Sequence, residues 1–233
     1  MLTILYRACD KELIYPLTRK ERPSWFNKIN CFNSLYKSIL SSKYKNDINV
    51  IVFMDGDKCI LSDFIEECGY TIIYNKLNSG PNSLKYQLDF SDDIDTDIYF
   101  VEDDYLHITE AIDHLYMGVK KFGLITGYDC IDRYVRTDDI TKDKESIYFY
   151  NGRHWRTAES TTLTWAVSKE LKSIIISNFK TYGWRDRVFF RNMFEKGIRL
   201  YQPIPGVSTH VHEPFLSPGI NWEEINNMNS KKI

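Results

Sequence analysis

The chain has 233 residues, 43% of them hydrophobic, and a net charge of -2. It is therefore long enough for one large domain with a buried core, and its balanced charge excludes a global field that recruits nucleic acid or an acidic membrane. No apolar run approaches a membrane span, and the N-terminus lacks a signal-peptide pattern. The five cysteines are scattered without CxxC spacing, which argues against a zinc knuckle or a disulfide framework. We expect a soluble cytoplasmic protein.

The first half alternates predicted strands and helices. Short apolar runs predict strands at residues 3–6, 49–54, 70–74, 98–101 and 123–127. Apolar side chains at spacings of three and four predict helices near residues 24–44, 61–68, 82–88 and 109–121. Strands that alternate with helices in this way predict an α/β fold with a mostly parallel, doubly wound central sheet.

The second half is less regular. Residues 129–152 are polar and weakly periodic, which predicts an excursion or a hairpin, and a strand is expected at 162–167. Two helices, at 168–179 and 184–195, and a short strand at 200–201 are expected to follow, then a loop over 203–218. We expect the polar tail over 226–233 to fray. Because no linker separates two parts, a single domain over 1–233 is expected.

Three acidic residues follow the apolar run Ile98–Val101, and they are the most informative feature of the chain. Carboxylates this close repel one another and resist desolvation unless a cation or hydrogen-bond donors compensate them. In open α/β sheets, ligands bind beyond the carboxyl ends of the strands, where Glu102, Asp103 and Asp104 would lie. Oxygen ligands at this place indicate Mg²⁺ or Mn²⁺ holding a diphosphate. The alternative is an acidic loop that caps the next helix.

Five segments stand in a fixed order along the chain: Tyr6-Arg7-Ala8-Cys9-Asp10, Phe53-Met54-Asp55-Gly56-Asp57, Asn78-Ser79-Gly80, Glu102-Asp103-Asp104 and His210-Val211-His212. Together they resemble the motifs of small GT-A glycosyltransferases. These enzymes depend on nucleotide sugars and are related to the large family-two group. The resemblance covers about half of the chain, and similar small transferase domains occur in large DNA viruses, phages and bacterial surface-glycan loci. A viral origin would place the protein in the host cytoplasm.

The resemblance implies that residues 1–127 bind the nucleotide sugar. Arg7 and Ala8 would lie along the nucleoside, with Asn78 in a later loop of the same pocket. Asp55 would accept a hydrogen bond from a uracil N–H. Two alternatives stay open: Asp55 and the glycine after it form a turn, because Asp-Gly is a strong turn signal, and Arg7 forms an ion pair at the surface.

The acidic group corresponds to the D-x-D motif of this family. Asp104 takes the third position and is expected to bind the metal directly. Glu102 replaces the usual aspartate at the first position and, being longer, is expected to reach the ribose hydroxyls, while Asp103 faces the sugar or forms a salt bridge. His210 and His212, two residues apart in extended chain, would face one ion and complete a Mn²⁺ or Mg²⁺ site. Ordinary surface histidines are the alternative.

The resemblance also implies that residues 128–225 hold the sugar and the acceptor. An inverting transferase needs a base that deprotonates the acceptor hydroxyl. Asp186 matches the position of that base at the start of a late helix, although an aspartate there also favours the helix dipole. Glu159 is the rival base. Trp155 and Trp184 are candidate stacking platforms for a sugar, whereas Trp165 is expected in the core.

The sequence thus predicts a metal-dependent glycosyltransferase that moves a sugar from a UDP-sugar to an acceptor hydroxyl with inversion. A sugar nucleotidyltransferase is one alternative, but its glycine-rich triphosphate loop is missing, because residues 8–21 contain no glycine. A non-catalytic module that binds glycan or nucleotide is another. A nuclease would need a basic stripe along which a phosphate backbone binds, and the chain offers none. The acceptor and the oligomeric state stay open.

Overall fold

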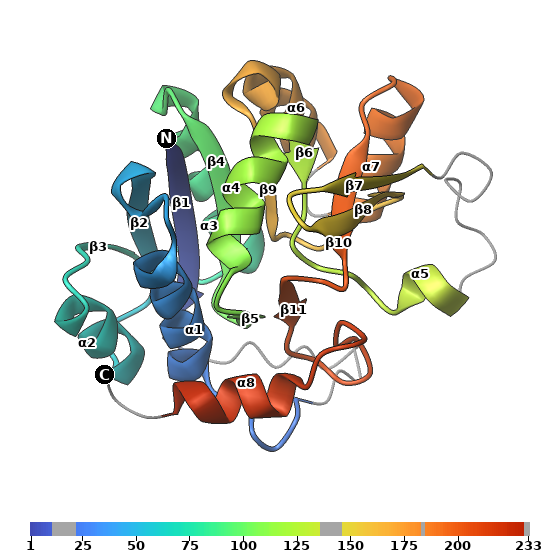
Figure 1. Cartoon of the computed structure of the whole chain (residues 1–233). Coiled ribbons are helices and arrows are strands. Elements are labelled where there is room, and N and C mark those ends of the chain that lie inside the picture. The colour runs from blue at the N-terminus through green and yellow to red at the C-terminus, as the bar shows by residue number, and fades with distance from the viewer. Residues whose placement is uncertain (11–21, 136–145, 183–184, 231–233) are drawn as a thin grey trace.

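The computed structural model describes residues 1–10, 22–135, 146–182 and 185–230. These residues form one mixed α/β domain in which helices cover both faces of a central sheet (Figure 1). Within the described residues the sheet has nine strands in the order β3-β2-β1-β4-β9-β6-β10-β8-β7. Most strands point the same way, whereas β9 and β8 run against their neighbours. The predicted fold class, a mostly parallel sheet flanked by helices in a single domain, is confirmed.

The first half follows the predicted alternation closely. Two of its helices begin at side-chain caps: the Asn27 side chain accepts from the backbone of Ile29 and Asn30, and Ser79 accepts from Asn82. Strands β1 and β2 each have parallel neighbours on both sides, whereas β4 pairs in parallel with β1 and in antiparallel with β9. The elements are β1 (Leu2–Cys9), α1 (Lys28–Ser41), β2 (Ile48–Asp55), α2 (Ile60–Glu67), β3 (Ile72–Asn75), α3 (Gly80–Phe90) and β4 (Asp97–Glu102).

The second half contains several elements that the sequence did not predict, above all the short strands β5 and β11 and the last helix. The elements are β5 (Tyr105–His107), α4 (Ala111–Phe122), β6 (Leu124–Ile125), α5 (Asp132–Val135), β7 (Ile147–Tyr150), β8 (Arg153–Ala158), β9 (Trp165–Val167), α6 (Lys169–Tyr182), α7 (Asp186–Glu195), β10 (Leu200–Ile204), β11 (Ser208–His210) and α8 (Trp222–Asn229). The strands β7 and β8 pair as an antiparallel hairpin at one edge of the sheet.

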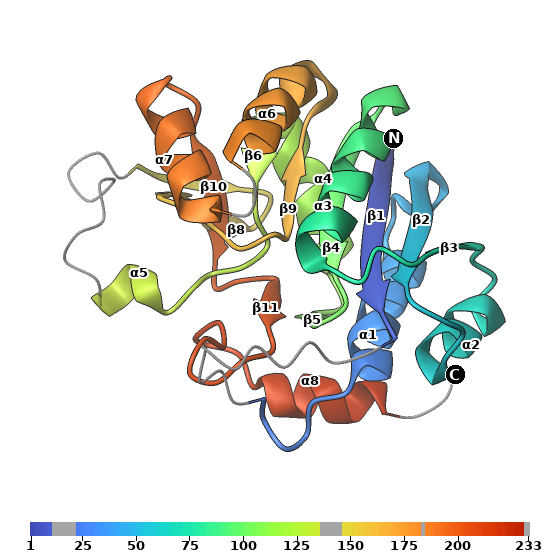
Figure 2. The same ribbon diagram turned by 180° about the vertical axis from the view of Figure 1, so that it is seen from behind.

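Two hydrophobic clusters hold the layers together. One joins the sheet to α1, α2 and α4 through side chains such as Phe32, Ile65 and Leu115. The other lies on the opposite face and joins the sheet to α3, α6 and α7, with Leu84 and Phe179 among its members. Figure 2 shows this second face, with α3, α6 and α7 in front of the strands. Burial on both faces explains why the central strands read as continuous apolar runs.

The predicted frayed tail is wrong over its described residues. Helix α8 extends through Asn229, and Asn226 is buried because its side chain bridges two segments of the N-terminal region. The Asn30 Nδ2 atom donates to the Asn226 Oδ1 atom at 3.0 Å, and the Asn226 Nδ2 atom donates to the Trp25 carbonyl at 3.0 Å. Amide side chains that look like a solvated tail in the sequence are therefore the polar contacts that dock α8. Residues 231–233 lie outside the described part.

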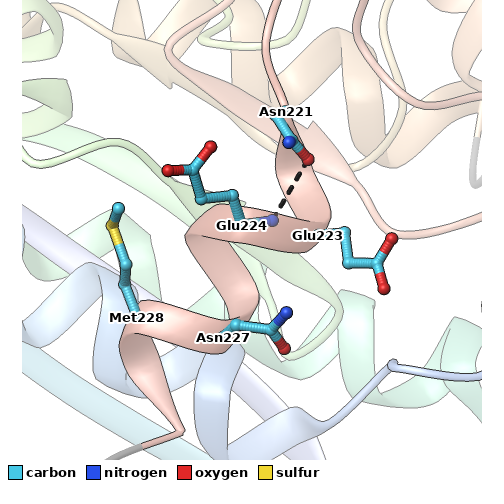
Figure 3. A pocket seen from close by; sticks show the side chains of 5 residues that line it. All are labelled: Asn221, Glu223, Glu224, Asn227 and Met228. Carbon is cyan, nitrogen blue, oxygen red and sulfur yellow. Dashed lines mark hydrogen bonds between the residues drawn. The ribbon is translucent and has the colours of Figure 1, made fainter.

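The outer face of α8 carries a shallow pocket of about 410 Å³ (Figure 3). Its lining is polar except for Met228, and the Asn221 side chain caps the helix by accepting from the Glu224 backbone. A second pocket of about 370 Å³ lies among residues of α1, α2 and α8. The linings of these two pockets include none of the residues that the sequence singles out. In the described part of the chain, no helix combines the length and the apolar character needed to cross a membrane.

Candidate functional site

The acidic residues lie where the parallel strands β1 and β4 end. The register pairs Arg7 with Glu102, and the Arg7 Nη2 atom is 2.5 Å from the Glu102 Oε1 atom. Asp103 accepts at its Oδ2 atom from the Cys9 backbone at 3.0 Å and lies 2.9 Å from the Lys28 ammonium. Burial raises the pKa of Glu102, and the Arg7 guanidinium opposes that shift. The chain therefore supplies hydrogen-bond donors to its own carboxylates. The alternative that these acids cap the next helix is wrong, because the element that follows them directly is the strand β5.

The two neighbouring predictions for β1 have different outcomes. Arg7 is an ion-pair partner, as one alternative holds, but its side chain is only 11% exposed and it lies inside the acidic site rather than at the surface. Ala8 was expected along the nucleoside in a loop, which is wrong for its side chain. It belongs to β1, is 3% exposed and packs in the core beneath α1 and α2.

A two-stranded antiparallel ladder brings the histidine loop to the acidic group. Strand β5 follows Asp104 directly and pairs with β11 so that Tyr105 faces His210, and the Val211 backbone donates to the Asp104 carbonyl at 2.9 Å. The His210 Nε2 atom lies 2.9 Å from the Asp104 Oδ2 atom. The ring of Tyr105 stacks on His210 at 5.3 Å, and the rings of His210 and His212 are 4.4 Å apart. Residues 106 positions apart in the sequence thus share one site.

Arg22 also contacts this site, although no pattern in the sequence points to it. Its Nη2 atom is 2.8 Å from the Asp104 Oδ2 atom, and its Nη1 atom donates to the Val211 carbonyl at 2.7 Å. The guanidinium lies over the Phe26 ring at 4.3 Å. Burial works to raise the pKa of Asp104, but His210 and Arg22 outweigh it and hold that pKa well below its usual range. Asp104 is therefore a fixed carboxylate. No motif marks Arg22, so only the tertiary structure reveals it.

The geometry fits a divalent cation. Asp104, His210 and His212 are all buried, and one candidate ligand atom from each lies within 4.8 Å of the others. The Asp104 Oδ1 atom is buried and has no hydrogen-bond partner among the described residues. One carboxylate and two imidazoles are a donor set that Mn²⁺ accepts, and a buried acceptor without a partner is costly unless something binds it. His107 does not belong to this group of candidate ligands. Burial lowers its pKa to about 3, and it contacts the Tyr99 hydroxyl at 2.9 Å.

The end of β2 acts largely as an anchor for a loop. The Asp55 Oδ1 atom accepts from the Leu77 and Asn78 backbones at 2.8 and 3.0 Å, a contact that neither the base role nor the Asp-Gly turn alternative describes. Asn78 is exposed and has a φ of 53°, a conformation that asparagine tolerates. Asn75, in register with Asp55, was not predicted. Both polar atoms of its side chain are buried and have no partner among the described residues, so it is a further candidate for contact with a nucleotide base.

Glu159 is not placed as a base. Its side chain is 0% exposed, and its Oε1 atom accepts from Arg191 and lies 3.3 Å from the Arg187 Nη2 atom. The Arg133 Nη1 atom is 3.6 Å from the Glu159 Oε2 atom. A fully buried carboxylate surrounded by three guanidinium groups has no open side at which an acceptor hydroxyl could bind. The prediction of Glu159 as a rival base is therefore wrong, and its contacts fasten α7 to the segment after β8.

Asp186 begins α7, as the sequence predicts. It is half-buried, and its Oδ1 atom accepts from the Arg187 backbone at 2.6 Å, so part of the carboxylate serves the first helical turn. This contact agrees with the helix-dipole alternative and leaves the base role a prediction.

The aromatic predictions separate clearly. Trp155 as a stacking platform is wrong: it is 0% exposed and packs against Phe122 with ring centroids 5.2 Å apart. Gly118 makes room for it, because a Cβ there would lie 2.5 Å from the indole ring. Trp165 is in the core, as expected. Trp184 lies outside the described residues.

Comparisons with known proteins show a similarity of fold alone. No family model matches the sequence, and no curated protein matches it. A solved structure described as a mycobacterial protein has a TM-score of 0.53 and 11% identity, over 98% of this chain and 70% of that one. CMP:2-keto-3-deoxy-manno-octonic acid synthetase complexed with CTP has a TM-score of 0.45 and 13% identity, over 88% and 92%. S. aureus TarS in complex with UDP-GlcNAc has a TM-score of 0.48 and 12% identity, over 86% and 55%.

Proposed function

We propose that the chain is a metal-dependent glycosyltransferase of the GT-A type that uses a UDP-sugar. The observation that carries the proposal is the meeting of Asp104, His210 and His212 beyond the ends of β1 and β4. A divalent cation held there would stabilise the negative charge that develops on the leaving nucleoside diphosphate. The resemblance of the ordered motifs to GT-A transferases supports the same reading, independently of the solved structures.

The remaining residues of the site have roles in this proposal. Arg7 and Glu102, paired at the strand ends, line the position of the ribose and the diphosphate, and Asp55 with Asn75 lies on the base side. Asp186 deprotonates the acceptor hydroxyl, which gives inversion of the anomeric carbon in a single displacement. Transfer of the sugar then balances: the acceptor oxygen forms the new bond, the bond to UDP breaks, and Asp186 takes the proton.

The test measures the melting temperature of the full chain with UDP, GDP, CMP or UTP, each with and without Mn²⁺. A ligand at 100 times its Kd stabilises the native state by about 2.7 kcal/mol, and each kcal/mol shifts the melting temperature by about 2–4 °C. We expect the shift with UDP only when Mn²⁺ is present. Asp104→Asn should abolish it, because the neutral amide removes the charge that holds the ion.

The matched control is Asp93→Asn, an exposed aspartate that lies in a short helical turn after α3. This variant should behave as the unchanged chain does. A shift of equal size with and without Mn²⁺, or one that survives in Asp104→Asn, overturns the proposed metal site. A preference for UTP over UDP indicates a sugar nucleotidyltransferase instead. UDP binding without transfer or hydrolysis of any UDP-sugar indicates the binding module.

A further inference from the structure

We propose that Arg22 exchanges partners during substrate binding, from Asp104 to the diphosphate, and that it thereby couples cation binding to nucleotide binding. The inference rests on the proposed function and assigns a substrate contact to a residue that no motif marks. It predicts that the positive charge of Arg22 weakens the binding of the cation when no nucleotide is present, and that the nucleotide removes this repulsion.

The contacts of one carboxylate carry the argument. The Asp104 Oδ2 atom lies 2.9 Å from the His210 Nε2 atom and 2.8 Å from the Arg22 Nη2 atom. A cation that binds the unpartnered Oδ1 atom of Asp104 would therefore share this carboxylate with the Arg22 guanidinium. Like charges this close repel, and the repulsion is strong because the Asp104 side chain is only 12% exposed. The ion and the Arg22–Asp104 pair thus oppose each other.

Two further contacts keep Arg22 beside the site after it leaves Asp104. Its Nη1 atom donates to the Val211 carbonyl, between the two histidines, and its guanidinium lies over the Phe26 ring. The Arg22 side chain is 28% exposed, more than Asp104 or either of the other two acids of the group, so it has room to turn outward. A planar guanidinium matches two oxygens of a phosphate as well as it matches a carboxylate.

A nucleoside diphosphate is therefore the group that takes Arg22 from Asp104. Its oxygens would bind the cation on one side and receive the guanidinium on the other, so that each positive charge keeps an anionic partner. The coupling is reciprocal: the nucleotide tightens cation binding by the same factor by which the cation tightens nucleotide binding.

The experiment measures Mn²⁺ binding to the folded full chain by the electron paramagnetic resonance signal of free Mn²⁺, first without nucleotide. Arg22→Gln should bind Mn²⁺ more tightly than the unchanged chain, by about tenfold, because one opposing charge is gone. UDP binding at saturating Mn²⁺, measured by calorimetry, should weaken by about tenfold in the same variant. Arg22→Lys keeps the charge and loses the planar fork, so its Mn²⁺ affinity should stay near that of the unchanged chain while its UDP affinity falls.

Arg153→Gln is the matched control. Arg153 donates to the Pro205 carbonyl, so it also holds the C-terminal loop by an arginine–carbonyl contact, but it does not contact the three metal-binding residues. It should leave both affinities unchanged. Equal or weaker Mn²⁺ binding in folded Arg22→Gln, or unchanged UDP binding, overturns the partner exchange. If the unchanged chain binds neither Mn²⁺ nor UDP, the proposed function itself fails, and this result is distinct from indifference to Arg22.

Discussion

At the scale of single residues, the acidic group is held by cations that the chain itself provides. Glu102 pairs with Arg7, Asp103 with Lys28, and Asp104 with Arg22. Three carboxylates beside one another at the end of a buried strand would otherwise be strongly destabilising. The acids differ in their other contacts: Asp103 joins the ends of β1 and β4, whereas Asp104 also contacts a histidine.

Asp186 is the residue whose proposed role as the base is easiest to separate from folding. Asp186→Asn keeps the size of the side chain and an oxygen that accepts from the Arg187 backbone, so the first turn of α7 should persist. We expect the kcat for sugar transfer to fall by about 10²–10⁴-fold, because a general base is lost, with the Kd for UDP unchanged. Steady-state kinetics and calorimetry check this. A kcat within threefold of the original would show that another group takes the proton.

At the scale of elements, helix α7 is attached to the sheet through a buried ionic cluster. Arg187 and Arg191 are one helical turn apart on α7 and both reach Glu159, which also faces Arg133 of α5. The cluster sets the position of the first turn of α7 and hence of Asp186. Glu159 contacts α5, which precedes it in the sequence, and α7, which follows it. Its role is therefore visible only in the folded structure.

Glu159→Ala should therefore be strongly destabilising. Removing one partner of a buried ion pair leaves charges without compensation and costs about 3–5 kcal/mol. Urea denaturation followed by circular dichroism measures the loss. Glu195→Ala, at the exposed end of the same helix, is the control and should change the free energy of unfolding by less than about 0.5 kcal/mol. Equal effects of the two substitutions on the free energy of unfolding would contradict the role of Glu159 in attaching α7 to the sheet.

The same scale shows what the sequence could and could not predict. Continuous apolar runs such as Ile98–Val101 identify buried parallel strands, so the first half was predicted nearly element by element. β5 and β11 were missed because strands of three residues leave no alternation to detect. Trp155 was placed on the surface of the site because an indole ring packs a core or a sugar equally well. Its burial depends on the space at Gly118, which lies on another element.

At the scale of the whole molecule, the C-terminal segment closes the site. After β11 the chain turns past the two histidines and returns as α8, which packs on α1 (Figure 1). Trp222 is 2% exposed and lies in a small cluster with Cys31, Leu106 and Val211, so the same packing holds α1, β5 and the histidine loop. The candidate histidines could be predicted from the sequence, but this closure could not, because its contacts span nearly the full chain length.

Trp222→Ala tests whether this closure positions the proposed metal ligands. Loss of a buried tryptophan costs about 3–5 kcal/mol, and here it removes the support of Val211, between His210 and His212. We expect Mn²⁺ affinity of the folded chain to fall by at least about tenfold, because a small displacement of the loop separates the ligands. Phe179→Ala, in the cluster on the opposite face, is the control with a comparable loss of stability. If both variants, measured where each is fully folded, bind Mn²⁺ as the unchanged chain does, then the closure stabilises the fold without positioning the ion. Loss of affinity in Trp222→Ala alone assigns the C-terminal segment a part in building the site.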